Sequence, residues 1–168
     1  MRQAIDHGHG QQEMLPGLLF SFPRFGQTMR LTSHTDYALR VLIFVGAAGR
    51  NVTISEISTA YAISKEHLRK VVHALSQHGY LSTSQGRYGG ITLAMPPDLI
   101  NIRKVVEQME NTNIVECFNR ATNTCAIDGM CLLKKALYEA RENFMSVLDR
   151  YQLNDLIRNP DLVAFCQS

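Results

Sequence analysis

Apolar side chains first recur at helical spacing near residue 32. Residues 32–48 place Ala38, Leu42 and Val45 on one face. The segment begins in a Ser- and Thr-rich stretch and stops at Gly49, which are start and stop signals of a helix. We therefore predict one helix over residues 32–48.

Two further helices follow, with residues 62–64 as a short turn between them. Thr53 and Glu56 fit a capping box at the start of the first helix, whose stripe is Ile54, Ile57 and Tyr61. Ser64 can cap the second helix, which ends at Gly79. Its apolar residues at i, i+3, i+4 and i+7 are Leu68, Val71, Val72 and Leu75. This arrangement predicts a helix-turn-helix.

A hairpin is expected next, with strands at Tyr80–Ser84 and Ile91–Ala94. Three of the six loop residues 85–90 are glycine, and Arg87 lies at the tip. A fourth amphipathic helix is expected at Ile102–Met109. A helix-turn-helix followed by such a hairpin indicates a winged helix.

The C-terminal part contains a seam typical of a long helix of about 20 residues. Its apolar positions step by 4, 3, 4, 3 and 4 and are Leu133, Leu137, Ala140, Phe144, Val147 and Tyr151. One helix cannot bury such a seam alone, so we expect it to cross the same helix of a second subunit in a homodimer. A short segment, 154–157, should pack back before Pro160. The predicted fold class is mainly α, a winged helix-turn-helix domain plus a long C-terminal dimerisation helix.

Four segments are predicted on this basis. They are a disordered extension (1–28, ahead of Met29), the winged-helix DNA-binding domain (29–110), an iron-sulfur cluster loop (111–131) and the dimerisation helix with the C-terminal segment (132–168). No apolar run reaches the ~18 residues that a membrane helix needs, and the start lacks a secretory signal. We therefore expect a cytoplasmic protein with no membrane partner.

Charge is distributed unevenly along the chain, although the formal net charge is only +2. From residue 30 to residue 90, seven Lys or Arg face three acidic residues, an excess of four. We predict that the third helix and the wing contact double-stranded DNA at a two-fold symmetric operator. The candidate contact residues are Ser64, Lys65, Glu66, His67, Arg69, Lys70, His73 and Arg87. A merely solvated basic face is the alternative.

Three cysteines crowd into the loop at residues 111–131. Seven residues separate Cys117 from Cys125, and five separate Cys125 from Cys131. Thiolates at such wide spacing suit an iron-sulfur cluster better than the tightly spaced ligand pairs of zinc. Spacing alone leaves zinc, or three unligated thiols, as alternatives. Cys166 stands apart and is interpreted as a small apolar residue in a frayed end.

From Met29 to Asn159, about three quarters of the chain, the sequence resembles the NsrR-like nitric-oxide-sensing iron-sulfur repressors. The winged-helix family of these repressors also includes IscR. The motifs that carry the resemblance are MRLTSHTDYALR, YGGITLA, INIRKVVEQME and the block VECF…TC…MCLLK. IscR-like members have a histidine three residues after the last cysteine, where this chain has Lys134.

The resemblance implies a cluster, 4Fe-4S rather than 2Fe-2S, held by Cys117, Cys125 and Cys131 with Asp36 from the other subunit. An Asp early in a helix can also simply favour the positive end of the helix dipole. The predicted function is a DNA-binding repressor controlled by a cluster that reacts with nitric oxide. Alternatives are a regulator of the same fold that senses iron-sulfur status, redox or a metabolite, and an iron-sulfur redox protein. No catalytic constellation is found, so an enzyme is not expected.

Overall fold

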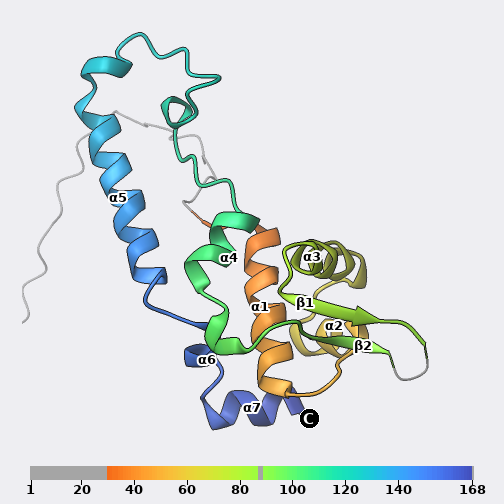
Figure 1. Cartoon of the computed structure of the whole chain (residues 1–168). Helices are drawn as coiled ribbons and strands as arrows, with labels where there is room; N and C mark the ends of the chain where they lie inside the picture. Colours follow the sequence, from red (N-terminus) through yellow and green to blue (C-terminus); the bar gives the residue numbers. More distant parts are fainter. Residues whose placement is uncertain (1–29, 87–88, 168) are drawn as a thin grey trace, which may run out of the picture. The chain divides into compact units, whose positions relative to one another are not determined.

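The computed structural model describes residues 30–86 and 89–167 of the 168-residue chain. Figure 1 shows α1 (Ser33–Ala48) near the centre of the described residues, and it packs against several other elements. Its residues Ala38, Val41 and Leu42 are fully buried, because the helix presents an apolar face to several neighbours. The helix ends at Gly49, which adopts a φ of +63°, so the predicted stop is confirmed.

The helix-turn-helix consists of α2 (Ile54–Tyr61) and α3 (Lys65–Gln77). The predicted capping box of α2 is present, since Thr53 and Glu56 each bond the other's backbone N–H. The Ser64 hydroxyl accepts a hydrogen bond from the His67 N–H and so caps α3, also as predicted.

The wing consists of β1 (Leu81–Ser84) and β2 (Gly90–Leu93), paired antiparallel with Leu81 opposite Leu93. A single bridge from Val52 to Ile91 joins the hairpin to the segment before α2. Arg87 lies outside the described residues, as do residues 1–28 and Met29. The predicted winged-helix fold class is confirmed.

A 3₁₀ turn, η1 (Pro97–Leu99), leads to α4 (Ile102–Met109), whose predicted bounds are correct. The loop that follows contains two 3₁₀ turns, η2 (Glu116–Phe118) and η3 (Asp128–Met130). The long helix α5 (Leu132–Leu148) then leads away from the cysteine loop, as Figure 1 shows.

The prediction that α5 continues to Tyr151 is wrong, because long-range hydrogen bonds end the helix at Leu148. The Asn101 side-chain amide donates to the Asp149 carbonyl at 2.9 Å, and the Ile102 N–H donates to the Tyr151 carbonyl at 3.0 Å. Tyr151 therefore lies in the connection between α5 and α6.

Two short helices close the chain, α6 (Leu153–Leu156) and α7 (Pro160–Gln167), and both pack against α1. The sequence interpretation missed α7 and placed Cys166 in a frayed end, which is wrong. Cys166 is 1% exposed, because α7 covers the apolar core that α1 presents there.

Candidate functional site

The face of α3 opposite its buried stripe is polar and exposed. Leu68, Val71, Val72 and Leu75 are buried in the core, so the polar side chains on the opposite face point outward. All seven of the described DNA-contact candidates are exposed; they are Ser64, Lys65, Glu66, His67, Arg69, Lys70 and His73. The structure thus brings these seven residues together on one helix.

Most of the positive charge on this face is not neutralised within the chain. Lys70 lies 3.5 Å from Glu66, and both side chains are largely exposed, so water weakens this pair. Lys65 and Arg69 form no ion pair with any residue that the structure describes. Free cations on an exposed helix are suited to phosphate contacts.

The start of α1 lies beside the recognition face. The rings of Tyr37 and His67 are 6.3 Å apart, and both line a hollow of about 250 Å³ between α1 and α3. Asp36 precedes Tyr37 and forms a two-bond ion pair with Arg40, with distances of 2.9 and 3.2 Å. The side chains of Asp36 and Arg40 are 43% and 46% exposed, so Asp36 is accessible from outside its own chain.

Polar contacts brace the loop that carries the three cysteines. One Glu116 carboxylate oxygen accepts hydrogen bonds from the Thr124 N–H at 3.1 Å and the Thr124 hydroxyl at 2.7 Å. These two hydrogen bonds lower the pKa of Glu116. Since Glu116 precedes Cys117 and Thr124 precedes Cys125, the bonds hold the segments of two cysteines against each other.

The third cysteine caps α5. The Cys131 sulfur accepts a hydrogen bond from the Lys134 N–H at 3.4 Å, and the Lys134 ammonium pairs with Asp128. Lys134 stands where IscR-like members have a histidine, and in this structure its side chain pairs with Asp128.

An aromatic and cationic stack attaches the loop to α5. The Arg141 guanidinium lies 5.1 Å from the Phe118 ring and 4.8 Å from the Tyr138 ring. Arg141 also pairs with Glu142, which lies 3.5 Å from Arg103 of α4. Cys117, directly before Phe118, is therefore positioned by α5.

The loop begins at a carboxylate that connects α4 to α1. Glu110 accepts hydrogen bonds from the Thr32 N–H at 2.7 Å and the Thr32 hydroxyl at 3.0 Å, and it lies 2.8 Å from the Thr35 hydroxyl. Burial opposes ionisation of Glu110, but these hydrogen bonds outweigh it and lower the pKa of the carboxyl. The base of the loop is thus fixed beside the helix start that carries Asp36.

Three free thiols on one loop suit an iron-sulfur cluster in number and chemistry. Cys117 and Cys131 are half-buried, and Cys125 is exposed. Across residues 30–86 and 89–167, no three Cys, His, Asp or Glu side chains are arranged to hold one metal ion. The three thiols fit a cluster in number and chemistry, and a site with four ligands would need one further ligand.

Sequence reasoning missed Glu110, Glu116, Thr124 and Asp128. Glu116 and Thr124 stand close to the cysteines, which is a weak signal. Glu110 bonds residues more than 70 positions earlier, so no local pattern could identify it.

The predicted dimerisation seam lies mostly on the surface of the described chain. Leu133 is 65% exposed, Phe144 44% and Val147 46%, while Leu137 is half-buried. Ala140 and Tyr151 are exposed as well.

None of the described helices is long and apolar enough to cross a membrane.

The helix-turn-helix, the wing and the cationic face of α3 define the class of protein, a winged-helix DNA-binding transcriptional regulator. The family model of Rrf2, an iron-dependent transcriptional regulator, matches residues 31–159. The chain belongs to the Rrf2 family.

Relatives and solved structures agree with this assignment. The chain is 48% identical to the transcriptional regulator NsrR of Bacillus subtilis over 136 residues, 79% of this chain and 93% of that protein. It is 46% identical to NsrR of Bacillus licheniformis, covering 95% of it. The resemblance stated from the motifs is confirmed, and because these relatives are regulators, so is the prediction that the chain is not an enzyme.

The fold matches CymR of B. subtilis with a TM-score of 0.63 at 21% identity, covering 77% of this chain and 97% of CymR. It matches T. potens IscR with a TM-score of 0.62 at 17% identity, covering 77% and 87%. At these identities the two structures support the fold alone.

Proposed function

We propose that the chain is a cytoplasmic, dimeric repressor that carries a 4Fe-4S cluster and leaves its operator when the cluster reacts with nitric oxide. The observation that carries the proposal is the position of the three loop cysteines. They lie inside the family match at residues 31–159, in a chain 48% identical to NsrR of B. subtilis.

Cys117, Cys125 and Cys131 would hold the cluster together with Asp36 of the partner subunit. When bound, the cluster would supply iron that thiolates hold firmly and that reacts with nitric oxide. Asp36 is the weakest of the four ligands, because a hard carboxylate oxygen suits this iron less than a thiolate does. Its bond is therefore the one expected to break first.

Arg40 gives Asp36 an alternative contact. The ion pair of Asp36 with Arg40 at 2.9 Å would compete with ligation of a cluster by Asp36. Exchange between ligation and the Arg40 pair would move the first turns of α1, where Tyr37 packs near His67 of α3. Such a two-state contact can transmit cluster loss to the recognition helix.

DNA recognition would be performed by the exposed face of α3 from each subunit. The seam on α5 would bury Leu133, Phe144 and Val147 between two copies, which sets the spacing of the two recognition helices. Cationic residues such as Lys65 and Arg69 would contact phosphates, and the N-terminal part of α3 would meet base edges.

The test uses protein purified without oxygen and an operator selected from a random DNA pool. We expect selective binding that weakens at least tenfold after nitric oxide is added, measured by gel shift, with a scrambled duplex as the control. Unchanged operator affinity would contradict nitric oxide sensing. Equal selective binding by cluster-free protein would instead favour a regulator that responds to iron-sulfur status.

A further inference from the structure

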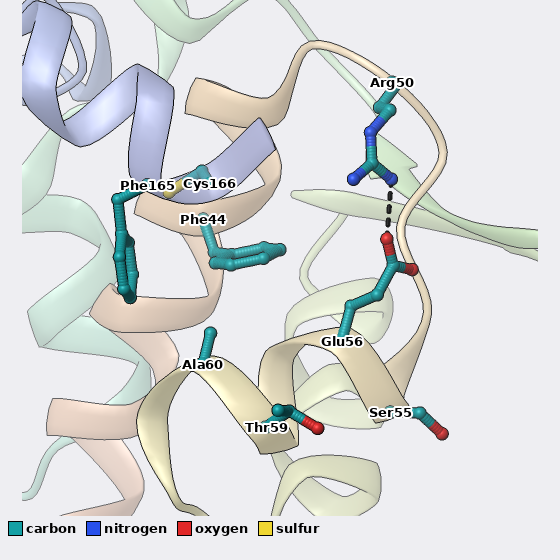
Figure 2. A pocket seen from close by; sticks show the side chains of 8 residues that line it. All are labelled: Phe44, Arg50, Ser55, Glu56, Thr59, Ala60, Phe165 and Cys166. Atoms are coloured by element: carbon teal, nitrogen blue, oxygen red, sulfur yellow. Dashed lines mark hydrogen bonds and ion pairs between the residues drawn. The ribbon is translucent and has the colours of Figure 1, made fainter. Parts of the chain in front are cut away.

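A cavity of about 390 Å³ lies between α2 and α7, apart from the cysteine loop and the face of α3 (Figure 2). Small-molecule sites typically measure ~300–1,000 Å³ and combine an apolar lining with a few polar groups. The family match ends at residue 159, whereas α7 starts at Pro160, so one wall lies beyond the matched region.

One side of the cavity is apolar. Phe44 of α1 and Ala60 of α2 line it together with Phe165 and Cys166 of α7. Burial raises the pKa of the Cys166 thiol, so this group stays neutral and behaves as part of the apolar wall. Two phenyl rings provide contacts for a flat or branched apolar body.

The other side is polar and is lined by Arg50, its ion-pair partner Glu56 and two hydroxyl side chains, and Arg50 has unused donors. The Arg50 Nη1 donates to Glu56 at 2.7 Å and to the Asn51 carbonyl at 3.0 Å. Its Nε and Nη2 make no hydrogen bond to any described residue, and the side chain is 45% exposed. Figure 2 shows the guanidinium at one end of the cavity and Phe165 at the other. The open edge of a guanidinium matches a carboxylate in a two-bond geometry.

We propose that this cavity binds a small monocarboxylate with an aromatic or branched apolar body, with Arg50 holding the carboxylate. This site is additional to the cluster function. Glu56, the ion-pair partner of Arg50, also accepts the Thr53 N–H at 2.7 Å in the capping box of α2. An anion bound to Arg50 would therefore lie next to Glu56, which caps α2, the first helix of the helix-turn-helix.

The test measures binding of phenylacetate to the full chain by ligand-observed NMR, with 2-phenylethanol as the neutral comparison. We expect millimolar or tighter binding of phenylacetate, at least tenfold weaker binding of the alcohol, and a similar loss in Arg50→Gln. Ala60→Phe should also abolish binding by filling the cavity, with no change at Arg50. The matched control is Arg158→Gln, which removes an exposed arginine that pairs with Asp155 at 3.5 Å.

Absence of phenylacetate binding at tens of millimolar would overturn the proposal, as would equal affinity in wild type and Arg50→Gln. Equal affinity for acid and alcohol would overturn the role of Arg50. Because the assay contains neither DNA nor cluster, its outcome is independent of the repressor function proposed above.

Discussion

The winged-helix region and the cysteine loop are held in different ways. In the first, helices α1 and α3 bury side chains such as Leu42 and Leu68 completely. In the loop, residues 111–131, no residue is fully buried. Its contacts include the hydrogen bonds of Glu116 with Thr124, the ion pair of Asp128 with Lys134 and the stack of Arg141 on Phe118. Apolar burial defines one conformation, whereas a few exposed polar contacts allow rearrangement. This difference would suit a rigid DNA-binding domain followed by a loop that can rearrange to hold the proposed cluster.

The largest effect on folding is expected in the core. Leu42→Ala should lower the free energy of unfolding by about 2–5 kcal/mol, because it opens a cavity beneath α1. Leu133→Ala, at a position 65% exposed, should change the unfolding of the monomer by less than about 0.5 kcal/mol. Urea denaturation at low protein concentration measures both. Equal losses would show that Leu133 is not on an open surface.

The seam on α5 predicts a change in assembly rather than in folding. Phe144→Glu should weaken the homodimer at least tenfold, because it places a charge in the apolar interface. Asn143→Glu, one position away and outside the seam, is the control. Sedimentation velocity separates the two forms. A dimer that survives Phe144→Glu unchanged would exclude this seam as the interface.

Bracing of the loop should affect how long the cluster is retained. Glu116→Ala removes both bonds to Thr124, and we expect chelator-induced loss of the cluster to be about tenfold faster. Glu139→Ala, an exposed change on α5, should leave the rate unchanged. The decay of visible absorbance reports the rate. If Glu116→Ala decays as slowly as wild type, the Thr124 contact has no role in holding the site.

A smaller effect is expected for one phosphate contact. Lys70→Gln should reduce the slope of log affinity against log salt by about one, and should weaken binding similarly for all sequences. Lys135→Gln on α5 serves as the control. Fluorescence anisotropy at several salt concentrations measures the slope. An unchanged slope would place Lys70 away from the DNA.

The smallest predicted effect is on pH dependence. Hydrogen bonds from Thr32 lower the pKa of Glu110 below its ordinary value of 4.5. Its stabilising contribution is therefore fully present above about pH 4.5 and is lost as the pH falls through the lowered pKa. Glu110→Gln should flatten the fall in thermal stability on acidification. If this variant loses thermal stability on acidification as steeply as the wild type, Glu110 does not contribute to that loss.

Local patterns were sufficient to predict the first half of the fold. Capping signals at Thr53 and Ser64 and apolar periods in α1 to α4 depend on neighbouring residues, so the sequence carries them directly. The end of α5 was wrong because the Asn101 bond to Asp149 spans 48 positions. The start of α7 had a usable signal, since proline is favoured at the first helical position.

The sequence could nominate candidate ligands for the proposed site, but not the contacts that surround them. Cys117, Cys125 and Cys131 stand out by residue type and spacing, and the resemblance nominated Asp36. The contacts that brace the loop are polar and irregular, without a period to reveal them. The proposed fourth ligand, Asp36 of a second subunit, is implied by the resemblance and not by the spacing of the cysteines.

The most direct test of the central claim is the visible absorbance and iron content of protein purified without oxygen, compared for three forms. The wild type should be brown with about four irons per site. Cys166→Ala, which alters the buried cysteine of α7, should match it, whereas Cys125→Ala should be colourless. A Cys125→Ala protein that keeps the full chromophore, or a colourless wild type, would contradict the account.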